Sequence, residues 1–371
     1  MVGGAEGRDS QTAKFNYWHT AGAVRVKLGI DICKNRPKGK HALFIAITCA
    51  GRILFHRINY IMSLQTAIPY VRYLEAKKSL DDRSLNRYVY SVLAMKLAKN
   101  APSNTLAILE VGAGIGTMMA RLLEWGLLQQ ATYTALDSRP DFVRETDRYL
   151  GDWARQWDFR FEHTAALERI ISRFAQMLNV EYQPEALENF LAKQTAPQWD
   201  VLVAHAFLDL VDLESTLPEL VRVVKPGGYL YLTLNFDGGT TFEPPIDPVM
   251  DAKIESLYHA SMETRQIAGR PAGSSHTGRQ LFTSLRQLGL PILAAGSSDW
   301  VVCAGAQGYP EDEAFFLSFI LDTIENSLGG LPEQVADRFP SWMDTRRAQL
   351  EAGELVYIAH QLDILAVRPE L

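Results

Sequence analysis

Short apolar runs alternate with segments of helical periodicity through the middle of the chain. The runs expected to form strands are 106–111, 133–136, 159–162, 201–204 and 229–234. The helical segments between them are 117–125, 140–150 and 213–224. Apolar strands that alternate with helices are typical of a parallel sheet with helices on both faces. The pattern therefore predicts an α/β fold with a doubly wound, mostly parallel sheet.

The rest of the chain divides around this alternation. Residues 62–104 show apolar positions at threes and fours, which predicts a helical cap. Residues 105–371 form the expected main domain, with helical lid insertions near 167–198, 237–282 and 305–352, and a last strand over 355–367. Residues 1–61 have no sustained period. Either they are a genuine, poorly ordered extension, or translation starts at Met62 and they are an annotation artefact.

Composition narrows the class of protein. The formal net charge of −6 and the pI of about 5.8 argue against a non-specific nucleic-acid binder. Cys33, Cys49 and Cys303 have no metal-binding spacing, so we expect free thiols in a reducing compartment and no metal. The most apolar early stretch, 42–55, is too short to span a membrane. We therefore expect a cytoplasmic protein that does not enter a membrane.

A glycine-rich turn carries the clearest chemical signal. Glu110-Val-Gly-Ala-Gly-Ile-Gly116 follows a predicted strand and opens a predicted helix. Glycine lets the backbone turn tightly and approach a ligand, and the helix N-terminus offers free N–H groups. A dinucleotide site would need G-x-G-x-x-G spacing, whereas these glycines fall at every second position. Asp137 ends the next strand, where an acid can accept hydrogen bonds from ribose hydroxyls.

The turn resembles the E-x-G-x-G-x-G motif of class I, Rossmann-like S-adenosylmethionine (SAM) dependent methyltransferases. Trp199–His205 is similar to that family's fourth strand, and Leu217–Leu234, with its Lys-Pro-Gly-Gly turn, to the following helix, turn and strand. The resemblance implies SAM as cofactor and a seven-stranded sheet whose last strand is antiparallel.

The resemblance also implies roles for single residues. It places the methionine end of SAM at Glu110, Gly112, Ala113, Gly114 and Gly116. It places the ribose at Asp137 and Ser138, and the adenine beside Thr164 and Ala165 after the third strand. His205 and Ala206 would lie near the sulfonium.

His205 is the candidate catalytic residue, because a histidine beside the methyl donor can deprotonate an acceptor. The alternative is a wall residue, since methyl transfer can run largely on proximity and orientation. Asp209 would either orient His205 or cap the next helix. Tyr258 and His276, in the insertion after the fifth strand, are the candidate substrate residues.

Several functions fit these residues. The acidic pI and the apolar insertions favour a small-molecule acceptor, with O-methylation ahead of N- or C-methylation. No Asn-Pro-Pro-Tyr run follows the fourth strand, which argues against DNA as a partner. An RNA or protein methyltransferase would need a basic stripe, for which the candidates are Arg83, Arg87, Arg265 and Arg270. An NAD-dependent oxidoreductase and an inactive scaffold subunit are further alternatives. The oligomeric state stays open, with a homodimer as one option.

Overall fold

The computed structural model describes residues 14–17, 28–31, 67–99, 105–267, 270–328 and 333–370. The chain splits into two compact units, Met1–Leu64 and Gln65–Leu371. In the first unit, β1 (Lys14–Tyr17) pairs antiparallel with β2 (Leu28–Asp31). The rest of the segment 1–61, for which we weighed a genuine extension against an annotation artefact, lies outside the described residues.

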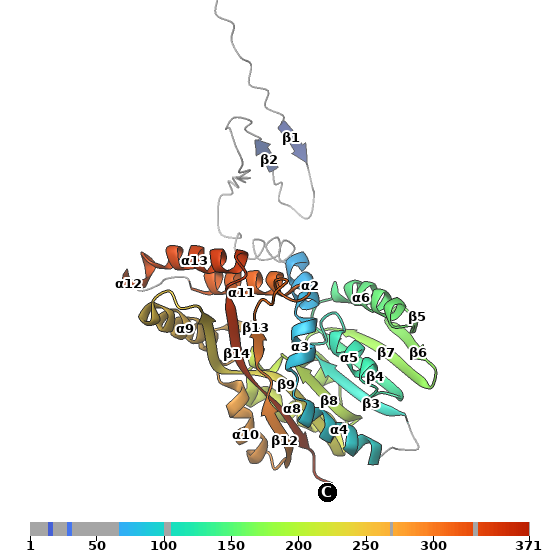
Figure 1. The fold of residues 1–371 in the computed structure, drawn as a ribbon. Helices are drawn as coiled ribbons and strands as arrows, with labels where there is room; N and C mark the ends of the chain where they lie inside the picture. The colour runs from blue at the N-terminus through green and yellow to red at the C-terminus, as the bar shows by residue number, and fades with distance from the viewer. Residues whose placement is uncertain are drawn as a thin grey trace, which may run out of the picture. The chain divides into compact units, whose positions relative to one another are not determined.

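A ten-stranded sheet organises the second unit (Figure 1). Its order is β12-β14-β9-β8-β3-β4-β7-β6-β5, with β13 also paired to β14. The bounds are β3 Leu106–Val111, β4 Gln130–Asp137, β5 Arg160–Ala165, β6 Glu168–Arg173, β7 Gln176–Pro184, β8 Trp199–His205, β9 Val224–Glu243, β12 Ile292–Ser297, β13 Trp300–Val302 and β14 Val356–Val367. The sheet is mostly parallel, because only β6 and β14 run against the rest. The predicted antiparallel last strand is confirmed.

Helices cover both faces of this sheet, and each face has its own hydrophobic core. On one face pack α4 (Arg87–Lys99), α5 (Thr117–Glu124) and α6 (Phe142–Gln156), with buried residues such as Val89, Met119 and Trp153. On the other face pack α7 (Leu187–Ala192), α8 (Leu213–Val223) and α10 (Thr277–Gln287), which bury residues such as Leu217 and Leu281. The mixed α/β class and the doubly wound arrangement follow the sequence prediction.

The strand predicted at 159–162 is present as β5 (Arg160–Ala165), but it does not pair with β4. The strand beside β4 is β7, and β5 lies at the edge of the sheet beyond β6. The expected helical insertion over 167–198 is also wrong, because β6 and β7 fill most of it and only α7 is helical. Successive residues of β7 alternate between buried and exposed, as in a strand with one face in the core. Its exposed positions are polar, for example Asn179 and Glu181, so the segment contains no continuous apolar run that would indicate a buried strand.

Helices outside the sheet gather at one end of it. The cap contains α2 (Ala67–Ala76) and α3 (Lys78–Ser84), followed by α4. Helices α2, α11 (Glu313–Ser327) and α13 (Phe339–Glu351) lie side by side in Figure 1. Helix α9 (Pro248–Glu263) packs against β9. None of the described helices is long and apolar enough to cross a membrane.

Strand β9 is longer than the predicted 229–234. It continues to Glu243, because β14 extends beside it and pairs with it as far as Val356. The helical insertion expected near 237–282 therefore begins as strand. The Lys225–Gly228 turn lies inside the assigned strand, with Gly227 at φ +77°. The sheet has more strands than the seven that the resemblance implies, because the β5–β6 hairpin and β13 are added to it.

Candidate active site

The glycine turn after β3 adopts a backbone that other residues rarely adopt. Gly112, Gly114 and Gly116 have φ values of +68°, +54° and +84°. A Cβ on Gly112 would lie 2.3 Å from Cδ2 of Phe207, so the position has no room for a side chain. Helix α5 begins directly after Gly116. The turn therefore presents bare backbone at a helix N-terminus, as the sequence predicted.

Asp137, at the end of β4, holds this turn with its carboxylate. Its Oδ2 accepts a hydrogen bond from the N–H of Gly114 at 2.9 Å, and its Oδ1 from the N–H of Arg139 at 3.0 Å. Burial raises the pKa of Asp137, while these two N–H groups oppose the rise. A hollow opens beside the carboxylate, and residues lining it include Ala113, Gly114, Arg139, Phe142, Gln183 and Pro184.

Glu110 lies beneath the turn rather than in this hollow. It is 2% exposed, and Tyr133 Oη donates a 2.7 Å hydrogen bond to its Oε2. Burial raises the pKa of Glu110 to about 8, although Tyr133 and Arg121 oppose the shift. The carboxyl is therefore largely protonated near neutral pH and supports the turn from the core.

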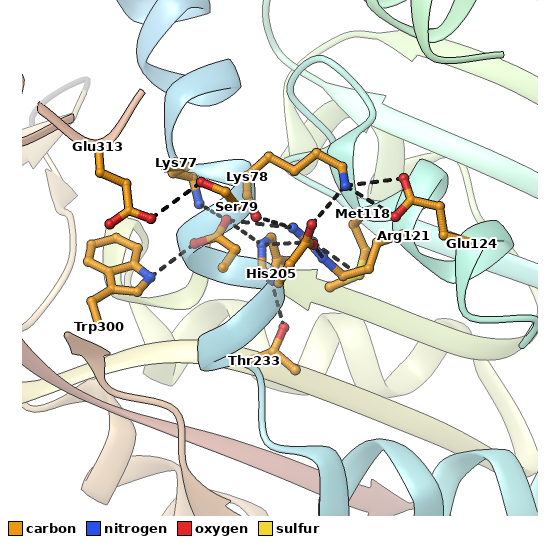
Figure 2. Close-up of polar contacts among 12 residues, drawn as sticks. Lys77, Lys78, Ser79, Met118, Arg121, Glu124, His205, Thr233, Trp300 and Glu313 are labelled. Atoms are coloured by element: carbon orange, nitrogen blue, oxygen red, sulfur yellow. Dashed lines mark hydrogen bonds and ion pairs between the residues drawn. The ribbon is translucent and has the colours of Figure 1, made fainter. Parts of the chain in front are cut away.

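His205, at the end of β8, is buried and held at both ring nitrogens. Nδ1 lies 2.9 Å from Oγ1 of Thr233, and Nε2 lies 3.1 Å from Oδ2 of Asp81 on α3 (Figure 2). Burial lowers the pKa of His205 to about 4, although Asp81 opposes the shift. The ring is therefore neutral at pH 7. Its proton is assigned to Nε2, which faces the carboxylate, and Nδ1 accepts from the Thr233 hydroxyl.

Asp81 is the centre of a buried charged cluster that joins α3 to the sheet. Lys77 Nζ lies 2.7 Å from Asp81 Oδ2, and Trp300 Nε1 donates to Asp81 Oδ1 at 3.0 Å. Arg121, also fully buried, bonds to Asp82 on the same helix (Figure 2). Although burial opposes it, Lys77 and His205 hold the pKa of Asp81 well below its usual range. His205 therefore anchors the cap helix above β8.

Comparison with known proteins adds the decisive observation. Residues 109–232, which run from β3 into β9, match the family model described as a methyltransferase domain. The chain contains a methyltransferase domain. The predicted class of enzyme, a SAM-dependent methyltransferase, and its cofactor, S-adenosyl-L-methionine, are confirmed at that level. The match decides against the NAD-dependent oxidoreductase. No curated protein matches the chain.

Solved structures with a similar arrangement are distant in sequence. A Bacillus halodurans C-125 protein assigned as a methyltransferase is 12% identical, with 75% of this chain and 99% of that chain covered and a TM-score of 0.41. A SAM-dependent methyltransferase from Methanosarcina mazei is 14% identical, with 74% and 98% covered and a TM-score of 0.37. The plantazolicin methyltransferase is 12% identical, with 85% and 90% covered and a TM-score of 0.36. Similarity at this level supports no conclusion about the acceptor.

The candidate site gathers some of the residues expected from sequence and separates others. Ala113, Gly114, Gly116 and Asp137 line one hollow. Ser138 is exposed beside Asp137. Ala206, at φ +49°, donates its N–H to the carbonyl of Thr233.

Thr164 and Ala165 do not lie beside Asp137. They are exposed on β5, which β6 and β7 separate from β4. The reason for choosing them was a third strand at 159–162 beside β4, and that reason is wrong. The corresponding place at the end of β7 is taken by Gln183 and Pro184, which the sequence analysis missed. The period-2 pattern of residues 176–182 is the signal that identifies this strand.

The two candidate substrate residues lie in different surroundings. Tyr258, on α9, is 8% exposed and belongs to the main hydrophobic core. His276 precedes α10 and lines a groove of about 530 Å³ between the end of β9 and α9. His276 Nε2 lies 3.0 Å from the position of a Cβ on Gly238.

Proposed function

We propose that this methyltransferase transfers the methyl group of SAM to a hydroxyl oxygen of a small-molecule acceptor. The observation that carries the proposal is the cap over the end of β8. Leu74 of α2 lies 3.2 Å from the position of a Cβ on Gly114, and Asp81 of α3 bonds to His205. A site covered this closely by the chain's own helices suits a small molecule better than a polymer.

The cap itself is packed with aromatic rings. Tyr73 of α2 stacks on Phe319 of α11 with ring centroids 4.3 Å apart, and on Phe316 at 5.6 Å. Tyr70 stacks on Phe142 at 6.1 Å, beside the hollow at Asp137. These contacts give the site an apolar roof, and such a roof excludes water and encloses a compact acceptor.

The alternative, an RNA or protein acceptor, needs a stripe of free cations beside the site. Two of its four candidate arginines are engaged by the chain itself. Arg83 forms hydrogen bonds to Glu313, and the Arg87 guanidinium lies 3.7 Å from the centroid of the Trp125 ring. Glu313 thus neutralises the charge of Arg83, and the Trp125 ring fixes the exposed Arg87 guanidinium in place, which favours the small-molecule proposal.

The residues around the glycine turn fit SAM. In our proposal, the bare backbone of Gly112–Gly114 faces the methionine end, with Glu110 and Gly116 supporting the turn. Asp137 has lone pairs beyond its two backbone bonds, and these accept from the ribose hydroxyls. Phe142 and Gln183 flank the adenine in place of Thr164 and Ala165. When bound, SAM supplies the electrophilic methyl group.

The test measures which molecules of a cell extract receive the methyl group, after the products are separated by size. The protein is incubated with methyl-labelled SAM and a cell extract, and the products are separated by ultrafiltration. We expect the label in small molecules that pass the membrane, as a methyl ether, and less of it with protein variant Asp137→Ala at the same SAM concentration. Label retained in RNA or protein would contradict the small-molecule proposal. Calorimetric titration with S-adenosylhomocysteine (SAH) checks cofactor binding separately.

A further inference from the structure

Asp209 has one carboxylate oxygen that the fold leaves without a hydrogen-bond partner. It lies in the 3-10 turn Leu208–Leu210, shortly after β8. Its Oδ1 is buried and has no hydrogen-bond partner among the residues that the structure describes. It does not cap α8, whose N-cap residue is Asp212. A buried acceptor without a donor is costly, so this carboxylate is suited to a donor from outside the chain.

The position of Asp209 ties it to the cofactor end of the site. Phe207, two residues earlier, packs directly on Gly112 of the glycine turn. Asp137 and Asp209 both raise the pKa of Tyr70, after burial as the largest cause, so the Tyr70 ring lies within electrostatic range of both. Asp209 therefore lies close in the chain to a residue that contacts the glycine turn, and it acts on the same tyrosine as the proposed ribose ligand.

Arg265 brings a positive charge into the same space. A Cβ on Gly273 would lie 2.3 Å from the carbonyl oxygen of Asp209 and 3.5 Å from Nη1 of Arg265. The glycine thus allows the Arg265 guanidinium and the Asp209 turn to lie close together. Within the described part of the chain, no ion pair or hydrogen bond of the Arg265 side chain is found. The pair offers one free acceptor and one free cation.

Aromatic rings lie in the neighbourhood of this pair. Tyr258 of α9 lies near both, since Arg265 lowers its pKa and Asp209 raises it, although burial is the main reason that it reaches about 12. Tyr70 and Phe207 lie on the cofactor side. Flat side chains of this kind favour a planar ligand.

We propose that Asp209 and Arg265 bind the two ends of the methyl acceptor, and that the acceptor is a small planar hydroxy acid. Its hydroxyl donates to the Asp209 carboxylate, and its own carboxylate pairs with Arg265. The assignment rests on the proposed function and specifies its substrate class.

Atoms and electrons balance in the proposed methyl transfer. The acceptor oxygen forms a bond to the methyl carbon while the carbon–sulfur bond breaks. The bonding pair goes to sulfur, which becomes the neutral thioether of SAH. The hydroxyl proton passes to Asp209, which ends as a neutral carboxylic acid.

Calorimetric titration of the SAH-loaded protein tests this inference. The probes are 2-, 3- and 4-hydroxybenzoate, with phenol and benzoate as single-ended controls. We expect at least one isomer to bind about tenfold more tightly than either control. Asp209→Asn should weaken that isomer about tenfold and leave benzoate unchanged. Arg265→Gln should weaken the isomer and benzoate but not phenol. Asp212→Asn, three residues along, is the matched control and should change nothing.

Two further measurements separate a binding role from a structural one. Burial raises the pKa of Asp209 to about 6, with Arg265 and Lys77 opposing, and Tyr70 and Tyr258 lie within electrostatic range of it. Affinity for the isomer should therefore rise between pH 5 and 7 in the wild type and stay flat in Asp209→Asn. That variant should also melt no lower than wild type, because it removes an unpaired buried charge.

The outcomes discriminate clearly. The inference is overturned if no isomer binds the SAH-loaded protein, if neither variant changes the binding, or if the wild-type affinity does not depend on pH. Failure of SAH itself to bind the wild type would instead contradict the proposed function.

Discussion

His205 Nε2 and Asp81 Oδ2 lie 3.1 Å apart, although 124 residues separate them in the chain. The contact joins the end of the central strand β8 to the cap helix α3. The contact holds the Nε2–H of the ring, while the Thr233 hydroxyl donates to Nδ1, the nitrogen that a general base would need. The predicted catalytic role of His205 and the anchoring role suggested by this contact lead to different results on mutation.

His205→Gln distinguishes these roles. As an anchor, His205 stabilises the cap, so the variant should lose about 1–3 kcal/mol of unfolding free energy, as expected when a buried partner of a charged group is lost. Its residual turnover should keep the wild-type pH profile. Urea denaturation and initial rates against pH provide the two measurements. A rate loss of a hundredfold or more without loss of stability would show that His205 is a base after all.

Asp81→Asn should destabilise the protein more strongly. Lys77 would stay buried without the carboxylate that compensates it, and Arg121 would keep only Asp82. Removing one partner of a buried pair costs about 3–5 kcal/mol. Thermal denaturation measures the loss, and Glu214→Gln, an exposed carboxylate on α8, is the control. Equal stability of the two variants would show that the cluster does not hold the cap.

Gly112→Ala should abolish SAH binding through a steric clash. Gly112 and Gly126 have nearly the same positive φ, but a Cβ on Gly126 meets nothing within 4 Å, whereas one on Gly112 meets Phe207. Gly126→Ala therefore reports the backbone cost alone, roughly 1–2 kcal/mol. Calorimetric titration and melting curves of both variants isolate the clash. The double variant Gly112→Ala/Phe207→Ala should recover stability, and failure to do so would mean that the clash is not the cause.

Asp137→Ala should weaken SAH binding by about 1–3 kcal/mol, the scale of a hydrogen bond to a charged group. The loss combines the ribose contact with the bond to the Gly114 N–H. Asp141→Asn, an exposed carboxylate beside Arg139, is the matched control and should bind SAH normally. Unchanged affinity in folded Asp137→Ala would place the ribose elsewhere.

Glu110 should make stability depend on pH. Its pKa is about 8 in the folded protein and near its ordinary value of 4.5 when unfolded, so the folded state holds the proton more tightly. The resulting stabilisation is complete below pH 4.5 and is lost as pH rises towards 8 and beyond. Glu110→Gln should remove this contribution to the slope in urea denaturation between pH 5 and 8. A slope identical in both proteins would show that Glu110 is ionised in the fold.

Local sequence determined the parts of the site that lie within one strand–turn–helix unit. The glycines and Asp137 were identified because a turn that must approach a ligand needs residues without a Cβ, and this need appears directly in the spacing. The alternation of apolar runs and helical segments was sufficient for the α/β class, because burial on both faces of a parallel sheet imposes it.

Tertiary structure decided what depends on pairing between distant segments. The sequence could not show that β7 rather than β5 lies beside β4, since both runs satisfy a strand pattern and only the hydrogen-bonded register distinguishes them. Nor could it show that Asp81 would reach His205, or that Asp209 would remain without a partner, because both depend on which helices cover the end of β8. The glycine turn is a local property of this sequence, whereas the surroundings of His205 and Asp209 arise from contacts across the whole fold.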